Sequence, residues 1–98
     1  MATVIAALDT TQRVTLDANA GDSAEITFPT GSKTCLLTFN DNPGRVAYAG
    51  TDSAAMATYH QQAAGQTIEW PLPQTGAPIL FLGSDTASVK VDVTALSS

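Results

Sequence analysis

The chain has 98 residues, of which 44% are hydrophobic and 13% charged, and its 4 Lys and Arg residues against 9 Asp and Glu give a formal net charge of -5. This length suits one domain, and low charge with ample apolar content excludes an intrinsically disordered chain. The sequence also excludes a membrane-spanning helix, because such a helix needs about 18 apolar residues in a row. It excludes a disulfide framework, because Cys35 is the single cysteine. The excess of acidic residues excludes a basic nucleic-acid-binding surface.

The first ten residues contain a short apolar stretch whose large members are Val4, Ile5 and Leu8. No Lys or Arg precedes this stretch and it is shorter than a signal-peptide core, so export by that route is not expected. Two interpretations stay open: a first strand that packs on its own domain, or an arm that docks on a neighbouring subunit. We therefore predict an N-terminal arm or first strand over residues 1–10, with these three residues as a candidate subunit interface, and one β-sandwich domain over residues 11–98.

Alternation of apolar and polar residues predicts half-buried strands in the first half of the chain. The first run consists of Val14 and Leu16 on either side of Thr15, and the second covers residues 24–28. The next predicted strand covers residues 33–39. The segment 40–44, Asn-Asp-Asn-Pro-Gly, is the strongest turn signal in the sequence. A further strand is predicted over residues 45–49. We expect it to form a hairpin with the strand before the turn.

The second half contains one ambiguous stretch and three further predicted strands. Residues 50–65 contain alanines that favour a helix, but too few for a stable one, so we interpret them as a long loop with one helical turn. Residues 67–70 alternate and end at a proline, which is typical of a strand that stops there. Residues 79–82 are all apolar, which indicates a strand buried on both faces, and residues 89–93 alternate most regularly.

Together these segments predict seven or eight short strands separated by turns rich in Gly, Pro and Asx residues. This spacing is typical of an all-β, single-domain antiparallel β-sandwich or jelly roll. A βαβ arrangement is not expected, because helix formers and helical periodicity are scarce.

Residues able to carry catalysis are few. His60 is the only histidine, and no second histidine or cysteine lies at zinc-site spacing. Cys35 alternates with the apolar residues of its predicted strand, which indicates a small buried hydrophobe, and no flanking motif supports a Cys35–His60 nucleophilic pair. Oxygen ligands near the turn are offered by Asp41, Asn42 and Asp52, but their spacing is not that of an EF-hand loop. The ordinary interpretation is that they stabilise the turn, and a weak surface cation site is the alternative. We expect no enzymatic activity, no catalytic residue, no cofactor and no bound metal.

The aromatic residues allow two interpretations. Tyr48 and Trp70 fall in phase with the apolar residues of their strands, which favours the core. Aromatic rings also stack on sugars, because their faces are apolar while their polar tips stay hydrated. Tyr59 and Trp70 are therefore a candidate ligand surface in the alternative interpretation.

Between residues 26 and 93 the sequence resembles small bacteriophage virion structural proteins of β-sandwich or jelly-roll type. The resemblance lies in short strands rich in Thr and Ala at residues 33–40 and 44–50, in a loop-to-strand entry at residues 63–70, and in a predicted closing hairpin made by residues 76–82 and 87–91. These strings are structural patterns, and none carries functional residues of the family.

The resemblance implies a capsid decoration (cement) protein that binds the outer face of the phage head and stabilises contacts between major capsid subunits. Its expected partners are the major capsid protein and further copies of the chain, with a trimer favoured, and no nucleic acid or membrane. Its expected location is the outer capsid surface of the virion, after synthesis in the host cytoplasm. The alternative is a carbohydrate- or receptor-binding module of a phage fibre or tail.

Overall fold

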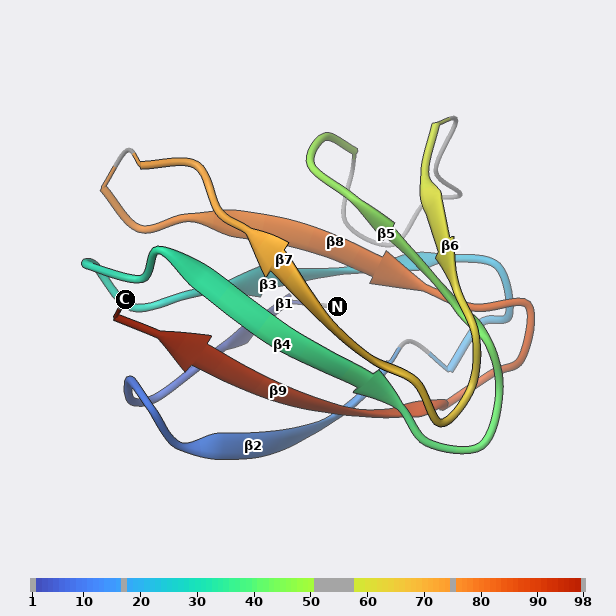
Figure 1. Ribbon diagram of the computed structural model, residues 1–98. Helices are drawn as coiled ribbons and strands as arrows, with labels where there is room; N and C mark the ends of the chain where they lie inside the picture. Colours follow the sequence, from blue (N-terminus) through green and yellow to red (C-terminus); the bar gives the residue numbers. More distant parts are fainter. Residues whose placement is uncertain (1, 17, 51–57, 75, 98) are drawn as a thin grey trace.

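The computed structural model describes residues 2–16, 18–50, 58–74 and 76–97. In those ranges the chain forms nine β-strands in two sheets (Figure 1). The strands are β1 (Ala2–Val4), β2 (Thr11–Thr15), β3 (Ser23–Thr27), β4 (Thr34–Phe39), β5 (Gly44–Ala47), β6 (His60–Gln62), β7 (Thr67–Pro71), β8 (Ile79–Gly83) and β9 (Lys90–Leu96). In the same ranges, no helix is long and apolar enough to cross a membrane.

The order of the strands is that of a jelly roll. The five-stranded sheet, here called sheet A, has the order β1-β3-β8-β5-β6, and the four-stranded sheet B has the order β2-β9-β4-β7. From β2 onward the antiparallel pairs are nested: β2 with β9, β3 with β8, β4 with β7 and β5 with β6. Eight strands in this order make a jelly roll, and β1 joins its edge parallel to β3. The predicted all-β sandwich is confirmed.

Every segment that alternates in the sequence forms a strand close to its predicted position. Within residues 50–65, interpreted as a loop, the short strand β6 was not predicted, because three residues are too few to show a period of two. Residues 54–57, where one helical turn was expected, lie outside the described ranges. With β1 and β6, the described part of the chain has nine strands instead of seven or eight.

Both predicted hairpins are wrong. The strands on either side of the 40–44 turn are β4 and β5, which lie in opposite sheets, and the closing hairpin fails in the same way because β8 lies in sheet A and β9 in sheet B. In each case the chain crosses between the layers at the turn. An alternating strand buries its apolar face equally well in either sheet, so the alternation does not reveal this choice.

The core lies between the sheets and contains the inward-facing apolar residues of both. Phe28 and Phe39 are its largest members, and both are almost fully buried. The ring of Phe39 lies directly over Gly44, where a Cβ atom would come within 1.8 Å of Cε2 of that ring. The tight crossing from β4 to β5 therefore requires a residue without a side chain.

The N-terminal segment packs on its own domain, which is the first of the two interpretations above. Ile5 is only 2% exposed and belongs to the core, and Leu8 packs against that core, whereas Val4 is 68% exposed. The side chain of Gln12 ties the segment to β2: its Oε1 accepts a 3.1 Å hydrogen bond from the amide of Ala6, and its Nε2 donates to the carbonyl of Val4 at 3.4 Å. Of the three candidate subunit-interface residues, Ile5 is therefore not available for such a contact in this fold, because the domain itself buries it.

Candidate functional site

The outer surface of sheet B is a polar face dominated by threonine. Along each strand the residues that point away from the core alternate with buried ones. We call this surface the threonine face; its members are Thr11, Arg13 and Thr15 of β2, Lys90, Asp92, Thr94 and Leu96 of β9, Thr34, Leu36 and Thr38 of β4, and Thr67 and Glu69 of β7.

Most polar side chains of the threonine face bond to one another across neighbouring strands. The hydroxyls of Thr11 and Thr94 lie 2.8 Å apart, and those of Thr38 and Thr67 lie 2.7 Å apart. The hydroxyl of Thr34 donates a 2.9 Å hydrogen bond to Oε2 of the Glu69 carboxylate.

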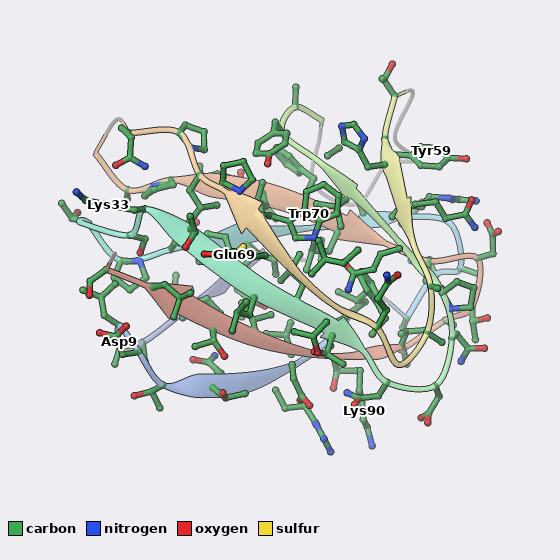
Figure 2. The ribbon with its side chains drawn as sticks, in the orientation of Figure 1. Asp9, Lys33, Tyr59, Glu69, Trp70 and Lys90 are labelled. Carbon is green, nitrogen blue, oxygen red and sulfur yellow. The ribbon has the colours of Figure 1, made fainter. Side chains whose placement is uncertain are left out.

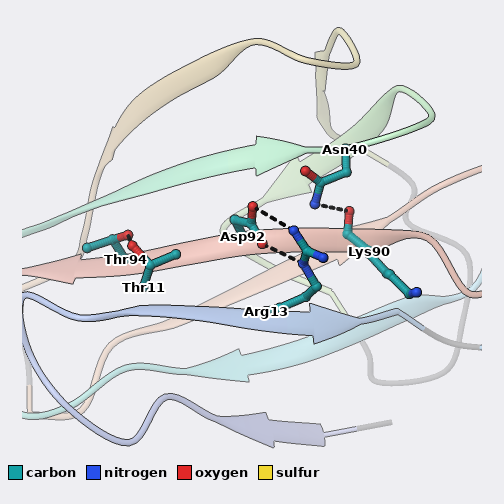
Figure 3. Close-up of polar contacts among 6 residues, drawn as sticks. All are labelled: Thr11, Arg13, Asn40, Lys90, Asp92 and Thr94. Carbon is teal, nitrogen blue, oxygen red and sulfur yellow. Dashed lines mark hydrogen bonds and ion pairs between the residues drawn. The ribbon is translucent and has the colours of Figure 1, made fainter.

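An ion pair and an amide contact complete this pattern (Figure 3). Nε of Arg13 donates to Oδ1 of Asp92 at 2.9 Å, and Nδ2 of Asn40 donates to the backbone carbonyl of Lys90 at 3.2 Å. The hydrogen bond from Arg13 lowers the pKa of the Asp92 carboxyl below its ordinary value of 3.8, because it favours the charged form.

These contacts lower the cost of dehydrating the eight polar side chains of the threonine face that take part in them. A polar group that loses water without gaining a partner costs about 1–3 kcal/mol, whereas a hydroxyl already bonded to its neighbour keeps that bond when the surface is covered. Threonine also loses less side-chain entropy on burial than Lys, Gln or Glu. The two cations on the face, Arg13 and Lys90, balance the two anions, Asp92 and Glu69. The face therefore adds nothing to the net charge of -5.

The aromatic residues gather where β5 and β6, of sheet A, approach β7, of sheet B. The ring centroids of His60 and Trp70 are 5.6 Å apart, and Nε1 of Trp70 donates a 3.0 Å hydrogen bond to the buried side chain of Gln62. The hydroxyl of Tyr48 donates to the carbonyl of Pro71 at 2.7 Å. These contacts join the edges of the two sheets, so their first role is structural.

The structure does not bring the candidate ligand residues Tyr59 and Trp70 together. Trp70 is partly buried and packs against the core, while Tyr59, the residue before β6, projects at the edge of the molecule (Figure 2). Tyr59 is 41% exposed, and the guanidinium of Arg45, which is ion-paired with Asp85, lies 4.8 Å from its ring centroid. The two rings therefore do not form one sugar-stacking platform.

Tyr48 also departs from its prediction. The residue is 39% exposed, although its phase with Val46 favoured the core. The strand β5 ends at Ala47, so the alternation no longer governs the next residue. Burial of part of the ring raises the pKa of the Tyr48 hydroxyl.

Cys35 and His60, the two residues considered for catalysis, lie in different surroundings, since Cys35 is buried and His60 is exposed. Cys35 has no exposed surface, and burial raises the pKa of its thiol to about 12, so the reactive thiolate is strongly disfavoured. His60 is exposed, and its ring contact is with Trp70. In the described ranges no three His, Cys, Asp or Glu side chains are grouped as metal ligands. Asp52, one of the three residues considered for a cation site, lies outside those ranges.

Sequence reasoning missed the threonine face and the role of Gln62. The outward threonines were visible as the polar phase of each predicted strand, but their pairing depends on the order and register of the strands. The side chain of Gln62 accepts a hydrogen bond from Trp70 and donates hydrogen bonds to two backbone carbonyls. The local sequence does not predict that such an amide is buried.

Comparison with protein-family models, with curated proteins and with solved structures finds no match to the chain. Its function must therefore be inferred from its own residues.

Proposed function

We propose that this protein is a phage capsid decoration (cement) protein, which binds the outer face of the head as a homo-oligomer and stabilises contacts between major capsid subunits. The observation that carries the proposal is the threonine face. Most of its polar side chains are held by one another and it bears no net charge, so it is suited to continuous contact with another protein.

The fold supports the same proposal. A decoration protein must hold its surfaces in a fixed arrangement, and here the two sheets are joined at both sides. Gln12 joins the N-terminal segment to β2, and Gln62 joins β6 to β4 and β7. The strands and turns also carry the resemblance to small phage virion proteins described above.

The overall charge is compatible with the outside of a capsid. A protein with a net charge of -5 is repelled by nucleic acid, whereas a protein that lines a DNA-filled interior is expected to carry positive charge. Among the described residues, Glu25 on sheet A and Asp85 after β8 are acidic groups that lie away from the threonine face.

The direct test is the protein composition of purified particles of the phage that encodes the chain. We expect mass spectrometry of separated heads and tails to find the protein in many copies in the head fraction. We expect cryo-electron microscopy to show it on the outer surface, between major capsid subunits. Heads assembled without it should lose their DNA at a lower temperature. A head fraction that lacks the protein would contradict the proposal.

The alternative, a carbohydrate- or receptor-binding module of a fibre or tail, has less support. It requires exposed aromatic rings that lie close together. Trp70 is partly buried, and the ring of Tyr59 is in contact with the guanidinium of Arg45. A glycan array checks it: binding that is lost in Tyr59→Ala while the variant keeps its melting temperature would favour this alternative over the capsid.

A further inference from the structure

The strands at the two edges of sheet B carry features that oppose pairing with a further strand. Arg13 lies at the centre of β2, and β7 contains Glu69 and ends at Pro71. Such residues protect an edge, because a charge loses water when a strand is added and proline has no N–H to donate. At one edge of sheet A, β6 consists of the polar residues His-Gln-Gln.

The other edge of sheet A is β1, which is protected only by its short length. Its residues are Ala2, Thr3 and Val4, none of which is charged. Val4 is 68% exposed, more than any other large hydrophobic residue in the described ranges. An uncharged and apolar edge of this kind is a template for a further strand.

The hydrogen bonds of β1 show which backbone groups face away from the sheet. The strand runs parallel to β3, and the amide of Ile5 donates to the carbonyl of Thr27 at 2.8 Å. Successive residues of a paired strand direct their N–H and C=O groups to opposite sides, so those of Val4 and Ala6 point away from β3. They lie where the next strand of sheet A would bind.

The side chain of Gln12 occupies this position. Its Oε1 accepts a hydrogen bond from the amide of Ala6 at 3.1 Å, and its Nε2 donates to the carbonyl of Val4 at 3.4 Å. A residue of a parallel strand bonds to its neighbour in the same way, because its N–H donates to one carbonyl and its C=O accepts from the amide two residues further along. Gln12 belongs to β2 of sheet B, so a side chain of one layer replaces a missing strand of the other.

We propose that the side chain of Gln12 blocks the edge of β1 and thereby prevents a second copy of the chain from pairing with it. The pairing that it blocks is antiparallel, β1 with β1, about a two-fold axis perpendicular to sheet A at Val4. Val4 then lies opposite Val4 of the second copy, and Ala2 lies opposite its Ala6. The symmetry makes the contact between Ala2 and Ala6 occur twice.

A second copy is the partner that suits this edge. The two-fold axis sets the edge against itself, and the residues that meet are uncharged, so no like charges face each other although each chain carries a net charge of -5. The exposed side chains of the two Val4 residues meet on the outer face of sheet A. In the wild-type chain Gln12 competes for the same backbone groups, and each copy must release its two hydrogen bonds before pairing.

Gln12→Ala removes the amide without adding apolar surface, and sedimentation velocity over a range of concentrations measures the result. We expect the variant to dimerise more tightly than the wild type by about tenfold or more, because no hydrogen bond has to be released first. Gln61→Ala is the matched control, since it removes an exposed glutamine from β6, the other edge strand of sheet A. This control should sediment as the wild type does.

A second substitution shows whether the association takes place at β1. In the Gln12→Ala background, Val4→Lys sets two cations opposite each other at the two-fold axis and should restore the sedimentation of the wild type, although it makes the chain less acidic. Val4 is exposed, so the lysine leaves the core intact. Circular dichroism melts confirm that each variant folds.

Hydrogen exchange separates pairing from simple loosening of the N-terminal segment. In Gln12→Ala the exchange of the Ala6 amide should slow as the protein concentration rises, because the second copy supplies a new acceptor. An amide that exchanges rapidly at every concentration would overturn the inference. So would a Gln12→Ala variant that sediments like the wild type, or a Val4→Lys substitution without effect. These measurements concern the free protein, so they are independent of the head-fraction experiment that tests the proposed function.

Discussion

The indole Nε1 of Trp70 donates a 3.0 Å hydrogen bond to Oε1 of Gln62, a side chain with no exposed surface. The amide nitrogen of Gln62 in turn donates to the carbonyls of Leu37 and Gln66, at 2.6 Å and 2.7 Å. Gln62 lies in β6 of sheet A, whereas Leu37 and Trp70 lie in strands of sheet B. One buried amide therefore joins the two layers.

Replacing Gln62 with methionine, which has a similar length but no amide, is expected to destabilise the fold. The free energy of unfolding should fall by about 2–4 kcal/mol, because the indole and two buried carbonyls lose their partner. Urea denaturation followed by Trp70 fluorescence measures the change. Gln61→Met, at the exposed neighbouring residue, is the control and should change stability by less than about 0.5 kcal/mol. Equal effects of the two variants would contradict the role given to Gln62.

Gly44→Ala is expected to be among the most damaging single substitutions. The added Cβ atom would lie 1.8 Å from Cε2 of Phe39, so the ring or the crossing between the sheets must move. We expect a loss of about 3 kcal/mol or more in unfolding free energy, measured by thermal or urea denaturation. In a Phe39→Leu background the same substitution should cost clearly less, because the smaller side chain leaves room. Additive effects of the two substitutions would show that the contact is not the cause.

Cys35 is expected to be unreactive in the folded protein. Its side chain has no exposed surface and its thiol has a pKa raised to about 12 by burial, so almost no thiolate exists at pH 8. A thiol reagent such as iodoacetamide should label the native protein slowly and the urea-unfolded protein rapidly at the same pH. Complete labelling of the native protein within minutes would show that the core opens near Cys35.

The Arg13–Asp92 pair predicts a specific dependence of stability on acid. The pKa of Asp92 is lower in the folded protein than its ordinary value of 3.8, so the pair stabilises the fold fully above about pH 5. This contribution is lost as the pH falls below 4 and through the lowered folded pKa. Because the pair is at the surface and is screened by water, its contribution to stability is small.

Asp92→Asn is therefore expected to lower the midpoint of urea unfolding at pH 7 and to have a smaller effect at pH 2.5. Thr94→Val, at a neighbouring position on the same strand, removes a hydroxyl but no charge and should show no such pH dependence. A difference between Asp92→Asn and the wild type that stays constant across this range would exclude the linkage.

The pattern of apolar and polar residues was enough to locate seven strands and most of the core. Cys35, Leu37 and Phe39 were predicted to share one face of a strand, and all three are fully buried. The nature of the strand is a local property, because successive side chains point to opposite sides. The short strand β6 was not predicted, because three residues are too few to show alternation. The burial of the Gln62 amide was not predicted either, since a polar residue gives no periodic signal of burial.

Which strands pair was decided only by the tertiary structure. The turn at residues 40–44 was predicted correctly as a turn, yet it joins two sheets instead of two neighbouring strands. The threonine face likewise exists because β2, β9, β4 and β7 lie side by side in one register, although Thr11 and Thr94 are far apart in the chain. The sequence by itself determined an acidic all-β domain with an apolar and a polar side to each strand. The tertiary structure decided the neighbours of each strand, because alternation satisfies the core in either sheet while hydrogen-bond register depends on residues distant in the chain.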